Sequence, residues 1–71
     1  MANPIAAYRR GDSIAVRFDD GNVNIFNSSM GEDAKWSLVC FDGRERGWEE
    51  MQLDEAEIAA DQCGLIWSDE N

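Results

Sequence analysis

The sequence predicts an α+β fold, in which a small antiparallel sheet of three to five strands carries one α-helix packed on a face. Two patterns support this: apolar and polar residues alternate on both sides of Asp20 and Gly21, and a helical apolar pattern stops at Gly64. The third observation is length, because 71 residues suffice for one small domain. We therefore expect a single compact domain over residues 1–71.

The first ten residues are compatible with two structures. Asn3 before Pro4, with Gly11 beyond, would suit a capped helix of about two turns. The apolar residues 5–8 would equally suit a strand that leads into a turn at Gly11 and Asp12. We favour the strand, because it would cover one edge of the hairpin that follows.

A β-hairpin is predicted over residues 13–27, where apolar residues recur with period two. Asp20 and Gly21 are typical of a two-residue type I′ turn, which needs positive φ at both positions. That turn would bring apolar residues opposite each other on one face of the hairpin. The expected register pairs Asp19 with Asn22, Phe18 with Val23, Arg17 with Asn24 and Val16 with Ile25.

Residues 27–33 have the composition of a loop, and residues 35–41 then predict a third strand. Because this strand carries apolar side chains on both faces, we expect it to be central or to have one side covered by a helix. A turn over residues 42–47 and an extended segment over 48–52, pairing back onto the sheet, should follow. A short final strand is expected over residues 65–67.

A helix is predicted over residues 54–63. Asp54 and Glu57 have the spacing of a capping box, Leu53 and Ile58 that of a hydrophobic staple, and Gly64 supplies the stop. At about 100° per residue the helix has a small apolar face and an acidic face. The apolar face comprises Ala56, Ala59, Ala60 and Cys63, and the acidic face Asp54, Glu57 and Asp61.

The composition disfavours catalysis and cofactor chemistry. The chain has no His, no serine in a nucleophile elbow and no glycine-rich phosphate loop. Cys40 and Cys63 lack metal-ligand spacing, and no segment has the alternating acidic spacing of a calcium loop. We therefore expect a protein that is not an enzyme and that binds no cofactor and no metal.

Net charge and the N-terminal sequence restrict partners and location. A formal charge of −9 repels phosphates, which argues against direct binding of nucleic acid or of an anionic membrane. No export signal precedes the domain and no apolar run is long enough to span a bilayer. A cytoplasmic chain with two reduced thiols is the expectation.

The charge is concentrated in the second part of the chain. Residues 1–41 carry five acids and four bases, whereas residues 42–71 carry ten acids and two bases. A solvated surface is the plain interpretation of such a run. Because no Lys or Arg occurs from Glu49 onward, we instead predict a binding surface, with Trp48 as an aromatic anchor beside it. Its acidic residues are Glu49, Glu50, Asp54, Glu55, Glu57 and Asp61.

Such a surface would imitate the outside of a nucleic-acid duplex. Carboxylates about one helical turn, or about 5.4 Å, apart would be steered onto a basic groove built for DNA. The partner would then be a basic nucleic-acid-binding protein, and inhibition would follow from occupancy. Reversing charges at Glu50, Glu57 and Asp61 should abolish inhibition, whereas reversing Asp19 and Asp20 should leave it intact.

In size and layout the chain resembles the small acidic anti-CRISPR proteins that inhibit type I systems. The resemblance rests on the hairpin over residues 13–27, the strand over 35–41, the acidic helix over 54–63 and the terminal segment 65–67. It implies a phage- or mobile-element-encoded protein that acts in the bacterial cytoplasm. It also implies binding to the Cascade complex, with the acidic residues against the large, PAM-reading subunit, so that target DNA is blocked.

Residues 11–21 are also similar to the first hairpin of SH3-like or Tudor-like barrels. This second resemblance implies a small barrel with a C-terminal helix that binds peptides or methylated side chains through an aromatic cage. Tyr8, Phe18, Phe26 and Phe41 would have to form that cage. A third alternative is an acidic interaction partner of another protein, with no inhibitory role.

Overall fold

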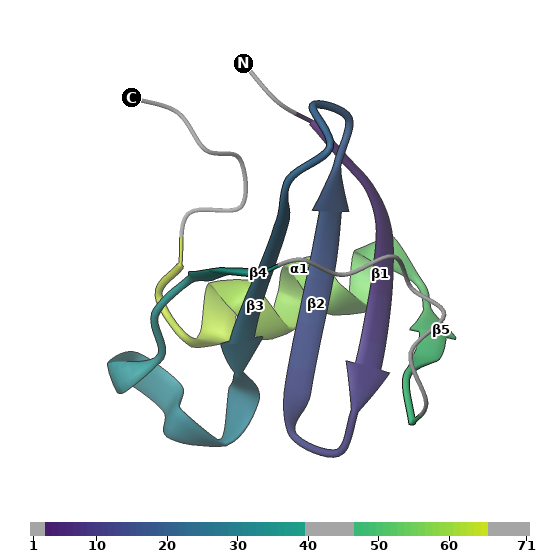
Figure 1. Cartoon of the computed structure of the whole chain (residues 1–71). Helices are drawn as coiled ribbons and strands as arrows, with labels where there is room; N and C mark the ends of the chain where they lie inside the picture. Colours follow the sequence, from purple (N-terminus) through teal and green to yellow (C-terminus); the bar gives the residue numbers. More distant parts are fainter. Residues whose placement is uncertain (1–2, 40–46, 66–71) are drawn as a thin grey trace.

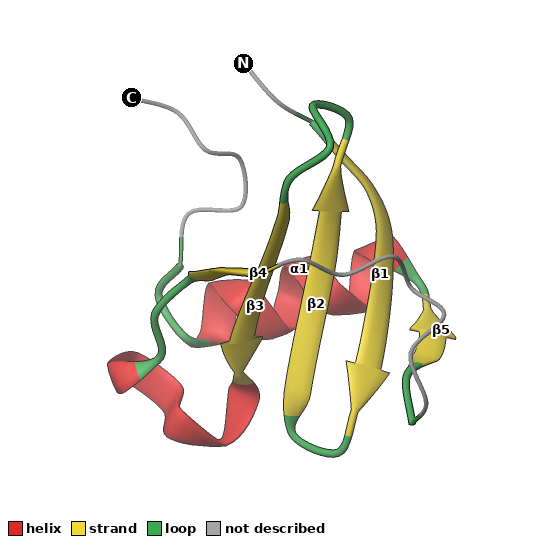
Figure 2. Cartoon of the chain, viewed as in Figure 1, coloured by secondary structure: helices red, strands yellow, loops and turns green. Residues whose placement is uncertain are grey.

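The computed structural model describes residues 3–39 and 47–65 and shows an open antiparallel sheet with one helix across a face (Figure 1). The sheet has five strands in the order β4-β3-β2-β1-β5, and α1 lies behind it (Figure 2). The predicted α+β fold is confirmed, and in the described part of the chain β4 and β5 are edges that do not close into a barrel. The elements are β1 (Pro4–Arg10), β2 (Ser13–Phe18), β3 (Val23–Asn27), η1 (Ser28–Asp33), β4 (Ser37–Val39), β5 (Glu49–Met51) and α1 (Leu53–Gln62).

The N-terminal segment is the strand β1, as we favoured, and it lies inside the sheet. It pairs with β2 on one side and with β5 on the other. Pro4 is the first residue of the strand, a position where the missing N–H is tolerated. β1 covers the β2 edge of the hairpin, as expected, and Ala7 is completely buried in the core.

The turn between β2 and β3 has three residues, not the two that we predicted. The Phe18 N–H donates to the Asn22 carbonyl at 2.8 Å, and the Gly21 N–H donates to the Phe18 carbonyl at 3.0 Å. Gly21 has φ +93°, and no described residue other than glycine has positive φ. A type I′ turn would need positive φ at Asp20 as well, whereas this turn places the left-handed conformation on glycine alone.

The longer turn shifts the predicted register by one residue. Val16 lies opposite Asn24 and Ile14 lies opposite Phe26. Ile14, Val16 and Phe26 therefore share the core on the helix side of the sheet. Val23 is also buried, but it is not part of that cluster. The register thus places the large Phe26 ring under the helix, which the expected pairing would have turned to the other face.

The segments between β3 and α1 differ from the prediction in two ways. Residues 28–33, expected as a loop, form the 3-10 helix η1. The predicted strand over 35–41 is described only as β4, which is an edge strand and not a central one, and residues 40 and 41 lie outside the described residues. The extended segment after Trp48 is confirmed as β5, but its partner is β1. Most of the predicted turn over 42–47 and residues 66 and 67 of the final strand also lie outside the described residues.

The start of α1 differs from the predicted capping box. Gln52 is the N-cap and makes no side-chain capping bond, and the helix begins at Leu53, one residue before the predicted range of 54–63. Asp54 and Glu55 instead lie in the first turn, where their charges favour the positive end of the helix dipole. Ile58 is 58% exposed, so the predicted staple with Leu53 is wrong.

The end of α1 is confirmed at Gly64. The Leu65 N–H donates to the Ala60 carbonyl at 2.9 Å, and the Gly64 N–H donates to the Asp61 carbonyl at 3.0 Å. Together with the Gly64 φ of +75°, these bonds form a Schellman motif. The motif satisfies carbonyls that the last helical turn would otherwise leave without partners.

Replacing Gly64 with Ala should lower the free energy of unfolding by about 1 kcal/mol. The cause would be conformational, since no atom lies within 4 Å of a Cβ placed there. Gly64→Asn should cost less, because Asn adopts the left-handed region more readily. Urea unfolding of the three proteins would check this order, and equal midpoints for all three would contradict it.

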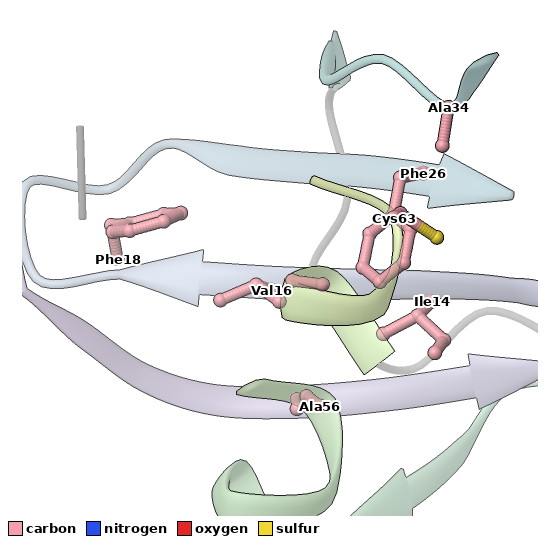
Figure 3. Packing of buried hydrophobic residues seen from close by; sticks show 9 residues of the cluster. Ile14, Val16, Phe18, Phe26, Ala34, Ala56 and Cys63 are labelled. Carbon is pink, nitrogen blue, oxygen red and sulfur yellow. The ribbon is translucent and has the colours of Figure 1, made fainter. Parts of the chain in front are cut away.

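The core lies between the sheet and α1 and is built around small helical residues (Figure 3). Ala56 and Ala60 are completely buried, and Cys63 is buried at the end of the same face. This face is the one that the helical spacing predicted. Small side chains let the helix backbone approach the sheet, where larger residues fill the space. Those larger residues are Ile14, Val16, Phe18 and Phe26, and Ala7 of β1 completes the sheet side of the cluster.

Candidate protein-interaction surface

The six predicted acidic residues lie on two consecutive elements that meet at the start of α1. Two are on β5 and four are on α1, and each of the six is exposed. One residue, Gln52, separates the two elements. Residues 47–65 contain no Lys or Arg, so no cation of the same segment neutralises them. The structure therefore brings Glu49, Glu50, Asp54, Glu55, Glu57 and Asp61 into one continuous run of β5 and α1.

Four of these carboxylates line an open groove of about 670 Å³ between β1, β5 and the first turn of α1. We call it the β5 groove. Glu49 and Glu50 line it from the strand, where consecutive side chains point to opposite faces of the sheet, and Asp54 and Glu55 line it from the helix. Arg9 is the one cation among its lining residues, and it is the partner of Glu49 in the β1–β5 register. The lining residues, four acidic and one basic, carry a net formal charge of −3.

The remaining acidic residues continue along α1 outside the groove. Asp54, Glu57 and Asp61 are three and four residues apart, so they follow one side of the helix on successive turns. We call these three residues the helix stripe. α1 has no basic residue in its last turn to balance them. The stripe is thus a line of uncompensated charge that begins at the groove, where Asp54 belongs to both.

Ile58 is a surface residue that the sequence interpretation missed. It lies four residues after Asp54 and three before Asp61, and it is more than half exposed. The helical spacing held the signal, because Ile58 is about 200° around the helix from the buried Ala56. The predicted staple instead required Ile58 to pack against Leu53. An aliphatic side chain therefore projects from the acidic side of the helix.

Trp48 is only half-buried, and one of its faces is already covered by the protein. The guanidinium carbon of Arg10 lies 4.7 Å from the centroid of a Trp48 ring, which is a cation–π contact. This contact joins the segment before β5 to the end of β1. Trp48 thus lies next to the acidic surface, as predicted, but it also has a structural role there.

The aromatic cage of the barrel alternative is not assembled. Phe18 and Phe26 are buried in the core under α1, where neither ring can meet a ligand. Tyr8 is the register partner of Ala15, on the neighbouring β2. Phe41 lies outside the described residues. The structure therefore removes the two central members of the predicted cage.

Residues 3–39 and 47–65 contain neither a metal-binding group nor a membrane-spanning helix. In these ranges no group of three or more Cys, Asp or Glu side chains is arranged to hold a metal ion. The helices described there lack the length and apolar character needed to cross a bilayer.

Comparison of the chain with protein-family models, with curated proteins and with solved structures finds no match in any of the three. Function is therefore inferred from the geometry and charge of this surface.

Proposed function

We propose that this protein is a non-enzymatic inhibitor that presents its acidic surface to the basic nucleic-acid-binding groove of a partner protein. The observation that carries the proposal is the run of six exposed carboxylates on β5 and α1, in a segment without any Lys or Arg. Potential of one sign over a surface attracts a partner of the opposite sign and speeds encounter. Occupying the partner's groove would exclude DNA without any chemical step.

The fixed geometry of the surface supports mimicry of a duplex. Along the helix axis the stripe carries a charge about every 5 Å, which is of the same order as the ~3.4 Å rise per phosphate of one DNA strand. The carboxylates sit on a strand and a helix rather than on a flexible tail, so binding orders less chain. Ile58 adds an apolar contact that a phosphate backbone lacks, which would favour a protein groove over a general cation.

The resemblance to small acidic anti-CRISPR proteins makes the type I Cascade complex the proposed partner. Its large, PAM-reading subunit would receive the acidic surface, and target DNA would be denied that site. With Cascade as its partner, the protein would act in the cytoplasm of a bacterial host, as a product of a phage or mobile element. An acidic interaction partner without inhibitory activity is the competing proposal.

A competition experiment tests this function. Purified type I Cascade complexes would be given a labelled target duplex in the presence of increasing amounts of this protein, first at 50 mM and then at about 200 mM salt. We expect inhibition that weakens by at least about tenfold at the higher salt, because exposed charges are screened over shorter distances there. Inhibition that is independent of salt would contradict charge mimicry, and a folded protein that blocks none of the complexes would contradict the proposed partner.

A further inference from the structure

β5, which carries Glu49 and Glu50, is paired with the sheet over a short length. Its three residues pair with residues 7–9 of β1, and it stands beside β1 at the end of the described strand order. Gln52 alone separates β5 from α1. The alignment of β5 on β1 therefore determines where the two glutamates lie relative to the acidic residues of the helix. Main-chain pairing holds so short a strand weakly, because few bonds have to break for it to open.

A side-chain contact extends this pairing by one position. Arg10 follows Arg9, which is the register partner of Glu49. The guanidinium carbon of Arg10 lies 4.7 Å from the centroid of a Trp48 ring. The Arg10 stem also packs on Gly47, because a Cβ built on this glycine would lie 3.0 Å from the Arg10 Cδ. Gly47 has φ +94°, so its backbone as well as its missing side chain favours this close approach. We call Arg10, Gly47 and Trp48 the β5 clamp.

The β5 clamp places a cation beside the acidic surface. Residues 47–65 contain no Lys or Arg, so Arg10 reaches this place from a distant part of the chain. If charge alone determined binding to a basic partner, this cation would weaken the attraction. Its contact with Trp48 gives it a different role, because a cation over an indole face stabilises the approach of the two segments that carry them.

We infer that Arg10 is a positioning residue of the acidic surface. Through Trp48 and Gly47 it holds β5 against β1, so that Glu49 and Glu50 keep a fixed place beside the start of α1. The inference rests on the proposed function where it concerns inhibition. A surface that is correctly arranged for only part of the time binds its partner more weakly in proportion. Removing this cation should therefore weaken inhibition, although it makes the protein more acidic.

Arg10→Gln and Arg17→Gln form a matched pair of variants. Both arginines are exposed strand residues, and each substitution changes the net charge from −9 to −10. Arg17 lies on β2, between β3 and β1 in the sheet. In the Cascade competition experiment we expect Arg10→Gln to inhibit about threefold more weakly than the wild type. Arg17→Gln should inhibit at least as well as the wild type. Equal inhibition by the two variants would overturn the inference.

Arg10→Lys separates the cation–π contact from other effects of changing this residue. A Lys ammonium is also attracted to an indole face, although it lacks the flat stacking of a guanidinium. We expect this variant to inhibit within about twofold of the wild type. Urea unfolding would check that the Lys and Gln variants are both folded. A folded Lys variant that inhibits as weakly as the Gln variant would contradict a role for the cation.

Amide hydrogen exchange followed by NMR tests the β5 clamp without any partner. The slowest amide among residues 49–51 reports how often β5 opens from β1. Arg10→Gln and Trp48→Leu should each speed its exchange about fivefold. The double variant should be no faster than Trp48→Leu alone, because both substitutions remove the same contact. Unchanged exchange in Arg10→Gln, or effects that multiply in the double variant, would overturn the inference.

The exchange result and the Cascade result fail independently. If the wild-type protein blocks no Cascade complex but the exchange effects of Arg10 and Trp48 are coupled, the proposed function is wrong and the positioning of β5 by Arg10 is retained. If the wild type blocks Cascade and Arg10→Gln blocks it as well as Arg17→Gln does, the inhibitor assignment is retained and the inference is wrong.

Discussion

Replacing Glu50, Glu57 and Asp61 together with Lys is expected to abolish inhibition and to leave the protein folded. The three side chains are exposed, so no buried contact is lost. Three reversals change the net charge from −9 to −3 and place cations where the partner's own cations would lie. We expect at least about 100-fold weaker inhibition, because like charges across an interface repel as strongly as opposite charges attract. The competition experiment measures the loss, and circular dichroism checks the fold.

The control for this experiment has to differ from the one that the sequence suggested. Reversing Asp19 and Asp20 was expected to leave inhibition intact, but both side chains hold the chain around the β2–β3 turn. Asp19 Oδ1 accepts from the Asn3 N–H at 3.1 Å, and the two carboxylate oxygens of Asp20 each accept from Asn22 at 3.0 Å. Reversing them would disturb the hairpin as well as the charge.

Asp12, Glu32 and Asp33 make a better matched control. They are exposed and belong to the β1–β2 turn and to η1 rather than to β5 or α1, and their reversal changes the net charge by the same amount. We expect this triple variant to inhibit within about threefold of the wild type, since its charges lie outside the proposed contact. A loss equal to that of the first variant would show that overall charge, and not this surface, determines inhibition.

Phe26→Ala should unfold the protein at room temperature or bring it close to unfolding. Phe26 is 3% exposed, lies opposite Ile14, and packs edge-to-face on Trp36 with ring centroids 5.1 Å apart. Truncating a buried Phe costs about 3–5 kcal/mol, which is comparable to the whole stability expected for so small a core. Far-UV circular dichroism during urea titration would measure the loss.

Met30→Ala provides the comparison for this prediction. Met30 is also a large apolar residue, but it is 53% exposed on η1, so its truncation removes little buried surface. Its urea midpoint should stay close to that of the wild type. A Phe26→Ala protein with the same cooperative transition as Met30→Ala would mean that the ring does not support the sheet–helix contact.

The fold class was predictable because its signals are local. Alternation on both sides of Gly21 and the glycine after α1 depend on neighbouring residues alone. The register was not predictable in this way, because Asp20 and Gly21 fit a two-residue turn and a three-residue turn equally well. Burial of Phe26 under α1 favours the longer turn, and that contact joins residues far apart in the chain. The pairing of β5 with β1 is long-range for the same reason.

Composition predicted the acidic surface, but it did not predict that the acidic residues separate into the β5 groove and the helix stripe. All six acids are exposed on β5 and α1, as the missing cations suggested. Their separation into a groove and a helix stripe depends on where β5 leaves β1, which no local pattern encodes. The capping-box spacing was misleading at Asp54, since the helix begins earlier, and the same error hid the exposure of Ile58.

The short, acidic β5 edge also bears on self-association. Exposed sheet edges are templates for pairing with identical molecules, and proteins protect them with brief strands and charged side chains. β5 has three residues, of which Glu49 and Glu50 are exposed. Two copies aligned along this edge would bring like charges together, so filaments that grow through it are disfavoured. The negative charge of this edge thus disfavours pairing with a second copy of the chain, whereas it does not disfavour pairing with a basic segment.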